Sequence, residues 1–177
     1  LVSPVQLAYA TAVLAADGKL IHPRLASRIG NQSALSPGAE MESIHKKDPQ
    51  NWEHVIDGML AVTEGQRGTA KRIRNEHYRI AGKTGTAQRA VGGGFDDQHH
   101  IAWFAGLMPM PHPRIAVVVA VEDPVEIDFW ASTVAAPVFA EIAEAAACLL
   151  DFAPTEPVPS PERRIAQGDA AAEGESA

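Results

Sequence analysis

The stretch AGKTGTAQ, from Ala81 to Gln88, places a lysine, two threonines and a glycine in four consecutive positions. A cation, hydroxyl groups and a backbone N–H could together hold a substrate carboxylate and the oxyanion that develops on an attacked carbonyl. On a strand at the edge of a sheet, a glycine would let the substrate approach closely. This combination predicts an acyl-transfer site, and its candidate residues are Lys83, Thr84, Gly85 and Thr86.

The same letters also match the end of a phosphate-binding loop, G-x-x-x-x-G-K-[ST]. That loop needs a glycine five residues before Gly82, where this sequence has His77. It also needs a helix after the lysine, so that amide groups point at the phosphates. A glycine run and a strand pattern follow Lys83 instead. We therefore expect no nucleotide cofactor. The other alternative is an ordinary strand or turn with no functional role.

Two helices are expected before this stretch. Ser3-Pro4-Val5-Gln6 combines a capping serine, a proline at the first helical position and a capping-box glutamine, and Gly18 would end this helix. A second helix is predicted from about Asn51 to Glu64. The apolar residues at helical spacing are Val5, Ala8, Ala12 and Ala16 in the first helix, and Trp52, Val55, Ile56, Met59 and Leu60 in the second.

Three strands and a helix should build the sheet around the candidate site. The segment from Tyr78 leads into it, followed by Ile101 to Leu107 and Ile115 to Val121. Short connections predict antiparallel pairing. The third strand is apolar on both faces, which predicts a central position with layers on both sides. A helix from about Pro137 to Leu150 would lie on the sheet through Val138, Ile142, Ala145 and Leu149.

These elements predict an α+β fold with an antiparallel sheet sandwiched between helices. The 177 residues suit one domain, and the net charge of −7 argues against nucleic acid as a partner. The longest apolar stretch, 131–150, is interrupted by Pro137, Glu141 and Glu144, so we interpret it as a soluble helix rather than a membrane span. Residues 154–177 have the composition of a disordered tail.

Several short motifs occur in the order found in one family. The chain resembles, over residues 1–153, the C-terminal part of the transpeptidase domain of class B penicillin-binding proteins, which cross-link peptidoglycan. The motifs are residues 1–8 (LVSPVQLA), Gly68-Thr69-Ala70, Ala81 to Gln88, Trp103-Phe104-Ala105-Gly106 and Val134 to Phe139. Glu122-Asp123-Pro124 together with Ala136-Pro137-Val138-Phe139 is more similar to the division-specific, septal branch than to the elongation branch.

This resemblance implies a role for each candidate residue. Lys83 would support the proton network and attract the carboxylate of the substrate or of a β-lactam. The hydroxyls of Thr84 and Thr86 would hold that carboxylate, the amide of Thr86 would complete the oxyanion hole, and Gly85 would leave room for the ligand. The partners implied are peptidoglycan stem peptides, β-lactams and membrane proteins of the division machinery, on the outer face of the cytoplasmic membrane. No metal or other cofactor is implied.

The family also needs a nucleophilic serine in S-x-x-K, and an S-x-N, both upstream of Ser3. No S-x-N occurs in this sequence, and its one S-x-x-K, Ser43 to Lys46, lies downstream of Ser3 among charged residues. We expect that the upstream half of the domain lies outside this chain, which has Leu at residue 1, and that the chain alone does not acylate. The alternatives are a non-catalytic module with the same fold and a self-contained serine hydrolase using Ser43.

Two polar clusters are interpreted as surface features. The first cluster, in the segment 96–100, could be a metal site. We interpret it as a polar loop instead, because neighbouring side chains on an extended segment point to opposite sides. The second cluster, a run of basic residues in the segment 67–74, is expected to be a solvated helix face. The alternative is a contact with peptidoglycan or with a partner. Trp103 and Phe104 are expected to pack under a helix, although Trp103 could border the substrate groove. The clusters are Asp96, Asp97, His99 and His100, and Arg67, Lys71, Arg72 and Arg74.

Overall fold

The computed structural model describes residues 2–21, 23–24, 28–33, 42–91, 94–124 and 128–155. The predicted tail therefore lies outside the described residues from position 156 onward. The elements follow one another as α1 (Pro4–Ala15), β1 (Arg28–Ile29), β2 (Gln32–Ser33), α2 (Pro49–Glu64), the 3-10 helix η1 (Lys71–Ile73), β3 (Ala81–Val91), β4 (Gly94–Met108), β5 (Ile115–Glu122) and α3 (Ala131–Leu149).

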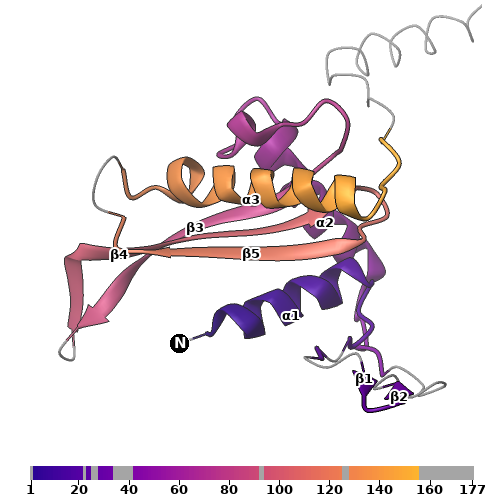
Figure 1. Cartoon of the computed structure of the whole chain (residues 1–177). Coiled ribbons are helices and arrows are strands. Elements are labelled where there is room, and N and C mark those ends of the chain that lie inside the picture. Colours follow the sequence, from indigo (N-terminus) through magenta and orange to yellow (C-terminus); the bar gives the residue numbers. More distant parts are fainter. Residues whose placement is uncertain are drawn as a thin grey trace, which may run out of the picture.

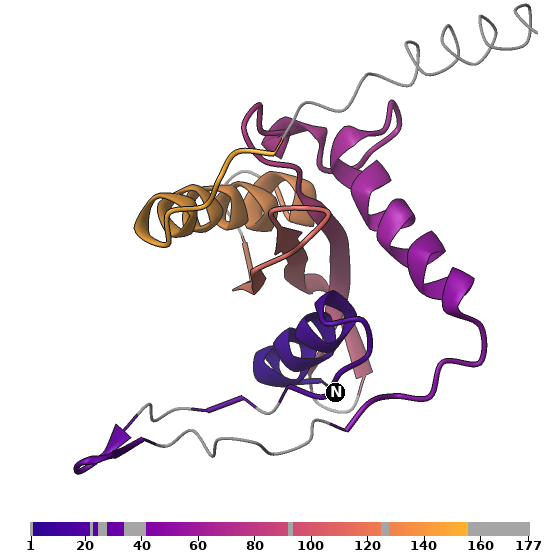
Figure 2. The same cartoon turned by 90° about the vertical axis from the view of Figure 1, so that its right-hand side faces the viewer.

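A three-stranded antiparallel sheet in the order β3-β4-β5 is the centre of the fold. In its register Lys83 lies opposite Ala105, and Met108 opposite Ile115. Helix α3 covers one face of the sheet and α1 the other (Figure 1). Helix α2 packs alongside β3 (Figure 2). The predicted α+β sandwich and the antiparallel pairing are confirmed.

The third strand occupies a different place from the one predicted. In the part of the chain that the structure describes, β4 lies between β3 and β5, so β5 is an edge strand. Both α1 and α3 pack against β5. An apolar pattern on both faces of a strand therefore predicts that layers cover both faces of the sheet. It does not predict whether the strand is central or at an edge.

Helix α1 begins as predicted. The hydroxyl of Ser3 accepts from the Gln6 N–H at 3.2 Å, and the Gln6 side chain accepts from the Ser3 N–H at 2.9 Å, which is the complete capping box. The expected apolar faces are only partly buried in the described structure. Val5 is 66% exposed in α1 and Val55 is 49% exposed in α2, whereas Met59 of α2 is buried.

Helix α3 begins earlier than predicted and presents the opposite face to the sheet. The predicted contact residues are exposed, with Ile142 at 43% and Leu149 at 84%. The buried face consists of small residues and one ring: Ala131, Ala135, Ala136, Phe139, Ala143 and Ala147. Alanines allow the helix to approach closely, and the Phe139 ring packs on Phe104 of β4, with 4.8 Å between ring centroids.

The apolar composition of α3 has one further consequence. By length and composition alone it is the one helix among the described residues that could cross a membrane. A helix in a protein core has the same properties, and the alanine face of α3 is buried with Phe104 and Val119 of the sheet. The packing therefore supports the interpretation of residues 131–150 as a helix that covers the sheet.

Candidate active site

The four candidate residues lie on β3, and their side chains alternate between the two faces of the sheet. Ala81 is buried in a cluster with residues of α1 and α2. A Cβ at Gly82 would instead meet the Phe104 ring, on the α3 side. The alternation of an extended strand then places Lys83 and Gly85 on the α1 side, and Thr84 and Thr86 on the α3 side.

In the described ranges, no strand pairs with the outer edge of β3. The carbonyl of Ile80 accepts a hydrogen bond from the Thr63 hydroxyl of α2, and therefore points away from β4. Backbone polar groups on a strand alternate in direction, so those of Gly82, Thr84 and Thr86 point to the same outer side. The Thr86 N–H is thus directed outward, as an oxyanion donor must be.

The ammonium group of Lys83 lies at this same edge. Its side chain is exposed, and Nζ donates to the Thr84 carbonyl at 2.6 Å. Beside it is a groove of about 300 Å³, lined by α1 residues and by Met59, Gly85 and Trp103. The cation is therefore available to a ligand and is not buried against the core.

The two threonine hydroxyls have partners on the other face. Thr86 Oγ1 accepts from the Ala131 N–H, the first residue of α3, at 3.3 Å. Thr84 Oγ1 lies 2.9 Å from Thr69 Oγ1, with either hydroxyl able to donate. Thr69 is a site residue that the sequence reasoning did not assign. Its position in the Gly68-Thr69-Ala70 motif was the available signal.

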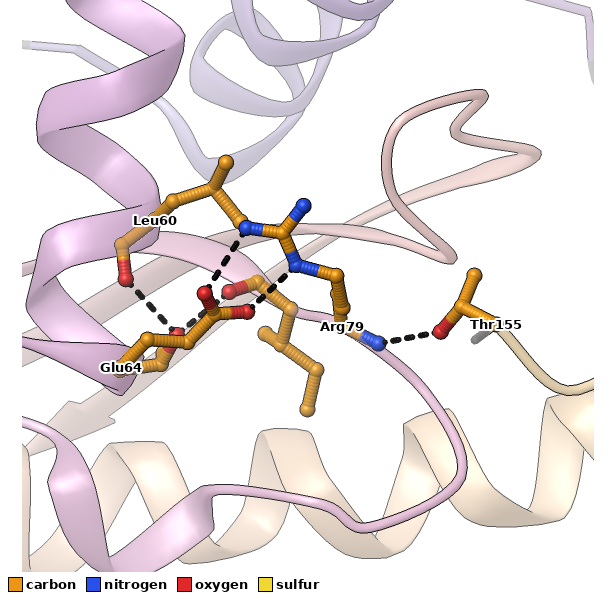
Figure 3. A network of polar contacts seen from close by, with 6 residues as sticks. Leu60, Glu64, Arg79 and Thr155 are labelled. Carbon is orange, nitrogen blue, oxygen red and sulfur yellow. Dashed lines mark hydrogen bonds and ion pairs between the residues drawn. The ribbon is translucent and has the colours of Figure 1, made fainter. Parts of the chain in front are cut away.

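The start of β3 is fixed to the end of α2 by a forked ion pair. Arg79 Nε and Nη2 donate to the two carboxylate oxygens of Glu64 at 2.9 and 2.8 Å (Figure 3). These hydrogen bonds raise the pKa of Arg79 above its ordinary value, so the guanidinium stays charged. The Arg79 N–H donates to Thr155 Oγ1 at 2.8 Å, and the Thr155 N–H to the His77 carbonyl at 2.8 Å. The lysine that follows is therefore held on an anchored strand.

The far end of the site is fixed by Asp123, just after β5. Its carboxylate pairs with Arg89 Nη1 at 2.8 Å and with His99 Nδ1 at 3.1 Å, next to the register shift of β3 after Gln88. Burial would raise the pKa of Asp123, but the close contacts with His99 and Arg89 prevail and lower it below its ordinary value. The carboxylate is thus held in its charged form.

An exposed aromatic stack borders the Thr86 end. The His100 ring lies parallel to Phe129 at 4.5 Å, and Phe129 contacts Trp130 at 4.9 Å. Trp130 is the residue before Ala131, whose N–H reaches Thr86. Of the predicted aromatic pair in β4, Phe104 packs under α3, whereas Trp103 lines the groove on the other face.

The remaining candidates are not assembled into a site. Ser43 is exposed and forms an isolated bridge with Lys19, outside any helix, while Lys46 pairs with Asp17 at 2.6 Å. Their S-x-x-K spacing therefore does not place them on successive turns of a helix. No group of three or more potential metal ligands gathers among the described residues. The side chains of Asp96 and Asp97 lie outside the described part.

The sequence is similar to that of proteins from one family. The penicillin binding protein transpeptidase domain matches residues 1–144. A probable peptidoglycan D,D-transpeptidase PbpC of Pseudomonas aeruginosa is 30% identical over 80% of this chain and 23% of its own length. A probable peptidoglycan D,D-transpeptidase PenA of Neisseria flavescens is 32% identical over 88% of this chain and 36% of its own length.

The chain is also similar to solved structures of penicillin-binding proteins. Penicillin-binding protein 2 of Pseudomonas aeruginosa, in complex with WCK 5153, is 40% identical over 81% of this chain and 30% of that chain, with a TM-score of 0.68. The transpeptidase domain of Burkholderia pseudomallei penicillin-binding protein 3 is 30% identical over 88% of this chain and 45% of that chain, with a TM-score of 0.72.

The chain belongs to the penicillin-binding protein transpeptidase family. Its named relatives are peptidoglycan D,D-transpeptidases, and it spans about a quarter to a third of the length of the two described above, at 23% and 36%.

Proposed function

We propose that this chain supplies one wall of the active site of a serine D,D-transpeptidase that cross-links peptidoglycan stem peptides. The proposal rests on the groups that lie together on the outer edge of β3. An exposed ammonium at Lys83 and an outward N–H at Thr86 lie on one strand, and Gly85 between them has no side chain to obstruct a ligand.

The roles of these residues follow from their positions. Lys83 and the hydroxyls of Thr84 and Thr86 would bind the terminal carboxylate of the donor peptide. A serine Oγ would attack the carbonyl of the D-Ala-D-Ala bond, the terminal D-alanine would leave, and an acyl ester would remain. The Thr86 N–H would stabilise the oxyanion in this step. The amine of a neighbouring stem peptide would then displace the serine and complete the cross-link.

The serine, its S-x-x-K lysine and the S-x-N would come from a segment outside this chain. The open surface of the chain supports this proposal. Helix α1 is apolar on nearly every side, and a helix of this kind is normally buried. Val5 of α1 is nevertheless 66% exposed, and Val2, just before the helix, is 61% exposed. The free edge of β5 could pair with a further strand. We propose that the domain includes residues 1–153 and extends to Thr155, which is hydrogen-bonded to Arg79 and His77. The predicted tail otherwise lies outside the described residues.

We further propose that β-lactams acylate the complete protein and that it acts outside the cytoplasmic membrane. The division-type assignment, with divisome membrane proteins as partners, rests on the segment 122–124 and on residues 136–139 at the centre of α3. Asp123 of this segment holds the far end of the site through Arg89 and His99, which gives the segment a structural role.

Labelling with a fluorescent penicillin tests the proposed function. The protein that carries this chain together with the upstream S-x-x-K and S-x-N should become covalently labelled, and Lys83→Ala should remove most of the label. A non-catalytic module is the second candidate, because Ser43 and Lys46 do not form a nucleophile pair. An open reading frame without an upstream S-x-x-K, and no label on its product, would support that candidate.

A further inference from the structure

The segment 65–75, here called the basic loop, carries charge opposite to that of the whole chain. It has four cationic side chains and no acidic one, in a protein of net charge −7. All four cationic residues are exposed: Arg67, Lys71, Arg72 and Arg74. The loop was expected to be a solvated helix face, but only Lys71–Ile73 form a short 3-10 helix.

The conformation of the basic loop is fixed by its contacts with α2. The Gly65 N–H donates to the Ala61 carbonyl at 3.0 Å, and the Ala70 N–H to the Val62 carbonyl at 2.9 Å. Ala70 and Ile73, three residues apart, are both buried, as the eclipsed positions of a 3-10 helix should be. The cationic side chains therefore project from a backbone that is held in place.

Three of these cations have no acidic partner in the part of the chain that the structure describes. Among the described residues none forms an ion pair with Arg67, Arg72 or Arg74, whereas Arg79 and Arg89 are both paired. Unpaired guanidinium groups on one small surface create a positive potential that attracts anions. Arginine is also the side chain best suited to binding a carboxylate through two parallel hydrogen bonds.

The basic loop also lies directly beside the candidate site. Thr69, at its centre, lies 2.9 Å from Thr84 through the two hydroxyl oxygens. Two residues of extended chain span at most about 7 Å, so the backbones of Arg67 and Lys71 lie within that distance of Thr69. The backbone that carries Arg67 and Lys71 therefore flanks the hydroxyl side of the β3 edge.

We infer that the basic loop is a second anion-binding subsite, which takes a carboxylate of the stem peptide other than the terminal one held by Lys83 and Thr84. The inference rests on the proposed function. A peptide is favoured over an anionic lipid surface because the loop meets the strand edge through Thr69, at the point where the end of the peptide would bind. Two separated anion sites would select peptides with a second carboxylate and fix their register along β3.

The test compares two peptides that both end in D-Ala-D-Ala, one with a free side-chain carboxylate and one with this group amidated. In the protein carrying the complete domain, kcat/KM for D-alanine release should favour the free acid. The double variant Arg67→Gln/Arg72→Gln should lose roughly three- to tenfold of this preference and retain activity on the amidated peptide. Raising the ionic strength from about 0.01 to 0.15 M, which shortens the Debye length from about 30 to 8 Å, should reduce the preference of the unmodified protein.

Lys47→Gln is the matched control. Lys47 is an exposed cation just before α2, whereas the basic loop follows the other end of this 16-residue helix, about 24 Å along its axis. This variant should keep the full preference.

Three results would overturn the inference. The first is equal kcat/KM values for the two peptides, and the second is an unchanged preference in the double variant. The third comes from a binding measurement with anionic lipid vesicles, in which the double variant loses vesicle binding but keeps its peptide preference. The last result would assign the loop to a membrane surface. If neither peptide is processed and penicillin does not label the protein, the proposed function itself fails, and the subsite with it.

Discussion

At the scale of single residues, the site depends on how one strand distributes its groups. Lys83 and Gly85 face the groove beside α1, Thr84 and Thr86 face α3, and the outward backbone groups of Thr84 and Thr86 lie between them. A strand edge thereby offers a cation, hydroxyls and an N–H donor to a single ligand. A helix would direct these groups around its circumference.

Lys83→Ala should lower the rate of acylation by penicillin about a hundred- to a thousandfold, because it removes the ammonium group that lies at the free edge of β3. The measurement is the second-order acylation rate of the complete domain. Lys83→Arg serves as the control for charge, and it should recover only part of the rate, because a planar guanidinium does not reproduce a compact ammonium. A rate unchanged in Lys83→Ala would exclude this residue from the site.

Thr69→Val should slow acylation about fivefold, the equivalent of losing one hydrogen bond of about 1 kcal/mol. The substitution removes the hydroxyl that lies 2.9 Å from Thr84 Oγ1 and nearly conserves the volume. Thr69→Ser, which keeps the hydroxyl, should restore the rate. If the valine and serine variants acylate equally fast, Thr69 has no influence on the site beyond packing.

At the scale of elements, local signals predicted what local interactions build. The capping box of α1 and the strand at Lys83 follow from neighbouring residues, and both are present. The contact of Thr69 with Thr84 could not be predicted, because it joins two segments through the tertiary fold. The face of α3 was mispredicted because both of its sides are apolar. Packing selects the side with the buried alanines, where the Phe139 ring fits over Gly106 and against Phe104.

The close packing of β3 under α3 predicts opposite effects for two glycines. A Cβ at Gly82 would lie 2.3 Å from Cζ of the buried Phe104 ring, so Gly82→Ala should destabilise the fold by about 1–3 kcal/mol. A Cβ at Gly85 would find its nearest atom at 3.7 Å, an ordinary contact. Gly85→Ala should therefore keep its unfolding midpoint but slow acylation, because the methyl group points into the groove.

Thermal unfolding and acylation rates, measured on the same two variants, check this pair of predictions. A Gly82→Ala protein as stable as the parent would contradict the described packing of Phe104. A Gly85→Ala protein that acylates at the parent rate would show that no ligand approaches β3 at this position.

The ion pairs of Asp123 should make stability depend on pH. Because the folded-state pKa of this carboxyl is lowered, its contribution is present above the unfolded value of about 3.9 and is lost as the pH falls through the folded value. The unfolding midpoint of Asp123→Asn should therefore fall less steeply below about pH 4 than the midpoint of the parent protein. Asparagine tolerates the positive φ of 46° at this position, so the backbone itself should not be strained.

Unfolding midpoints of the parent and of Asp123→Asn, measured between pH 7 and pH 3, test this dependence. Parallel curves throughout this range would mean that the pairs with Arg89 and His99 contribute nothing to stability.

At the scale of the whole molecule, the described chain is a sheet with helices on both faces, and the proposed site lies on the outer edge of β3. Helix α3 covers one face of the sheet through its buried alanines, and residues of α1 line the Lys83 groove on the other side. Val5 of α1 and Val2 just before it are exposed. The basic loop lies at the opposite border of the same strand edge. The described chain therefore presents an exposed apolar surface at the start of α1 and a cationic surface at the basic loop.

The most direct test of the central claim isolates the outward N–H of Thr86. Thr86→Ala keeps this N–H, and Thr86→Pro removes it at an edge-strand position where proline is tolerated. In the complete domain, the alanine variant should acylate within about tenfold of the parent, and the proline variant about a hundred- to a thousandfold more slowly, at a similar unfolding midpoint. Equal acylation rates in two folded variants would contradict the claim that this strand edge stabilises the oxyanion.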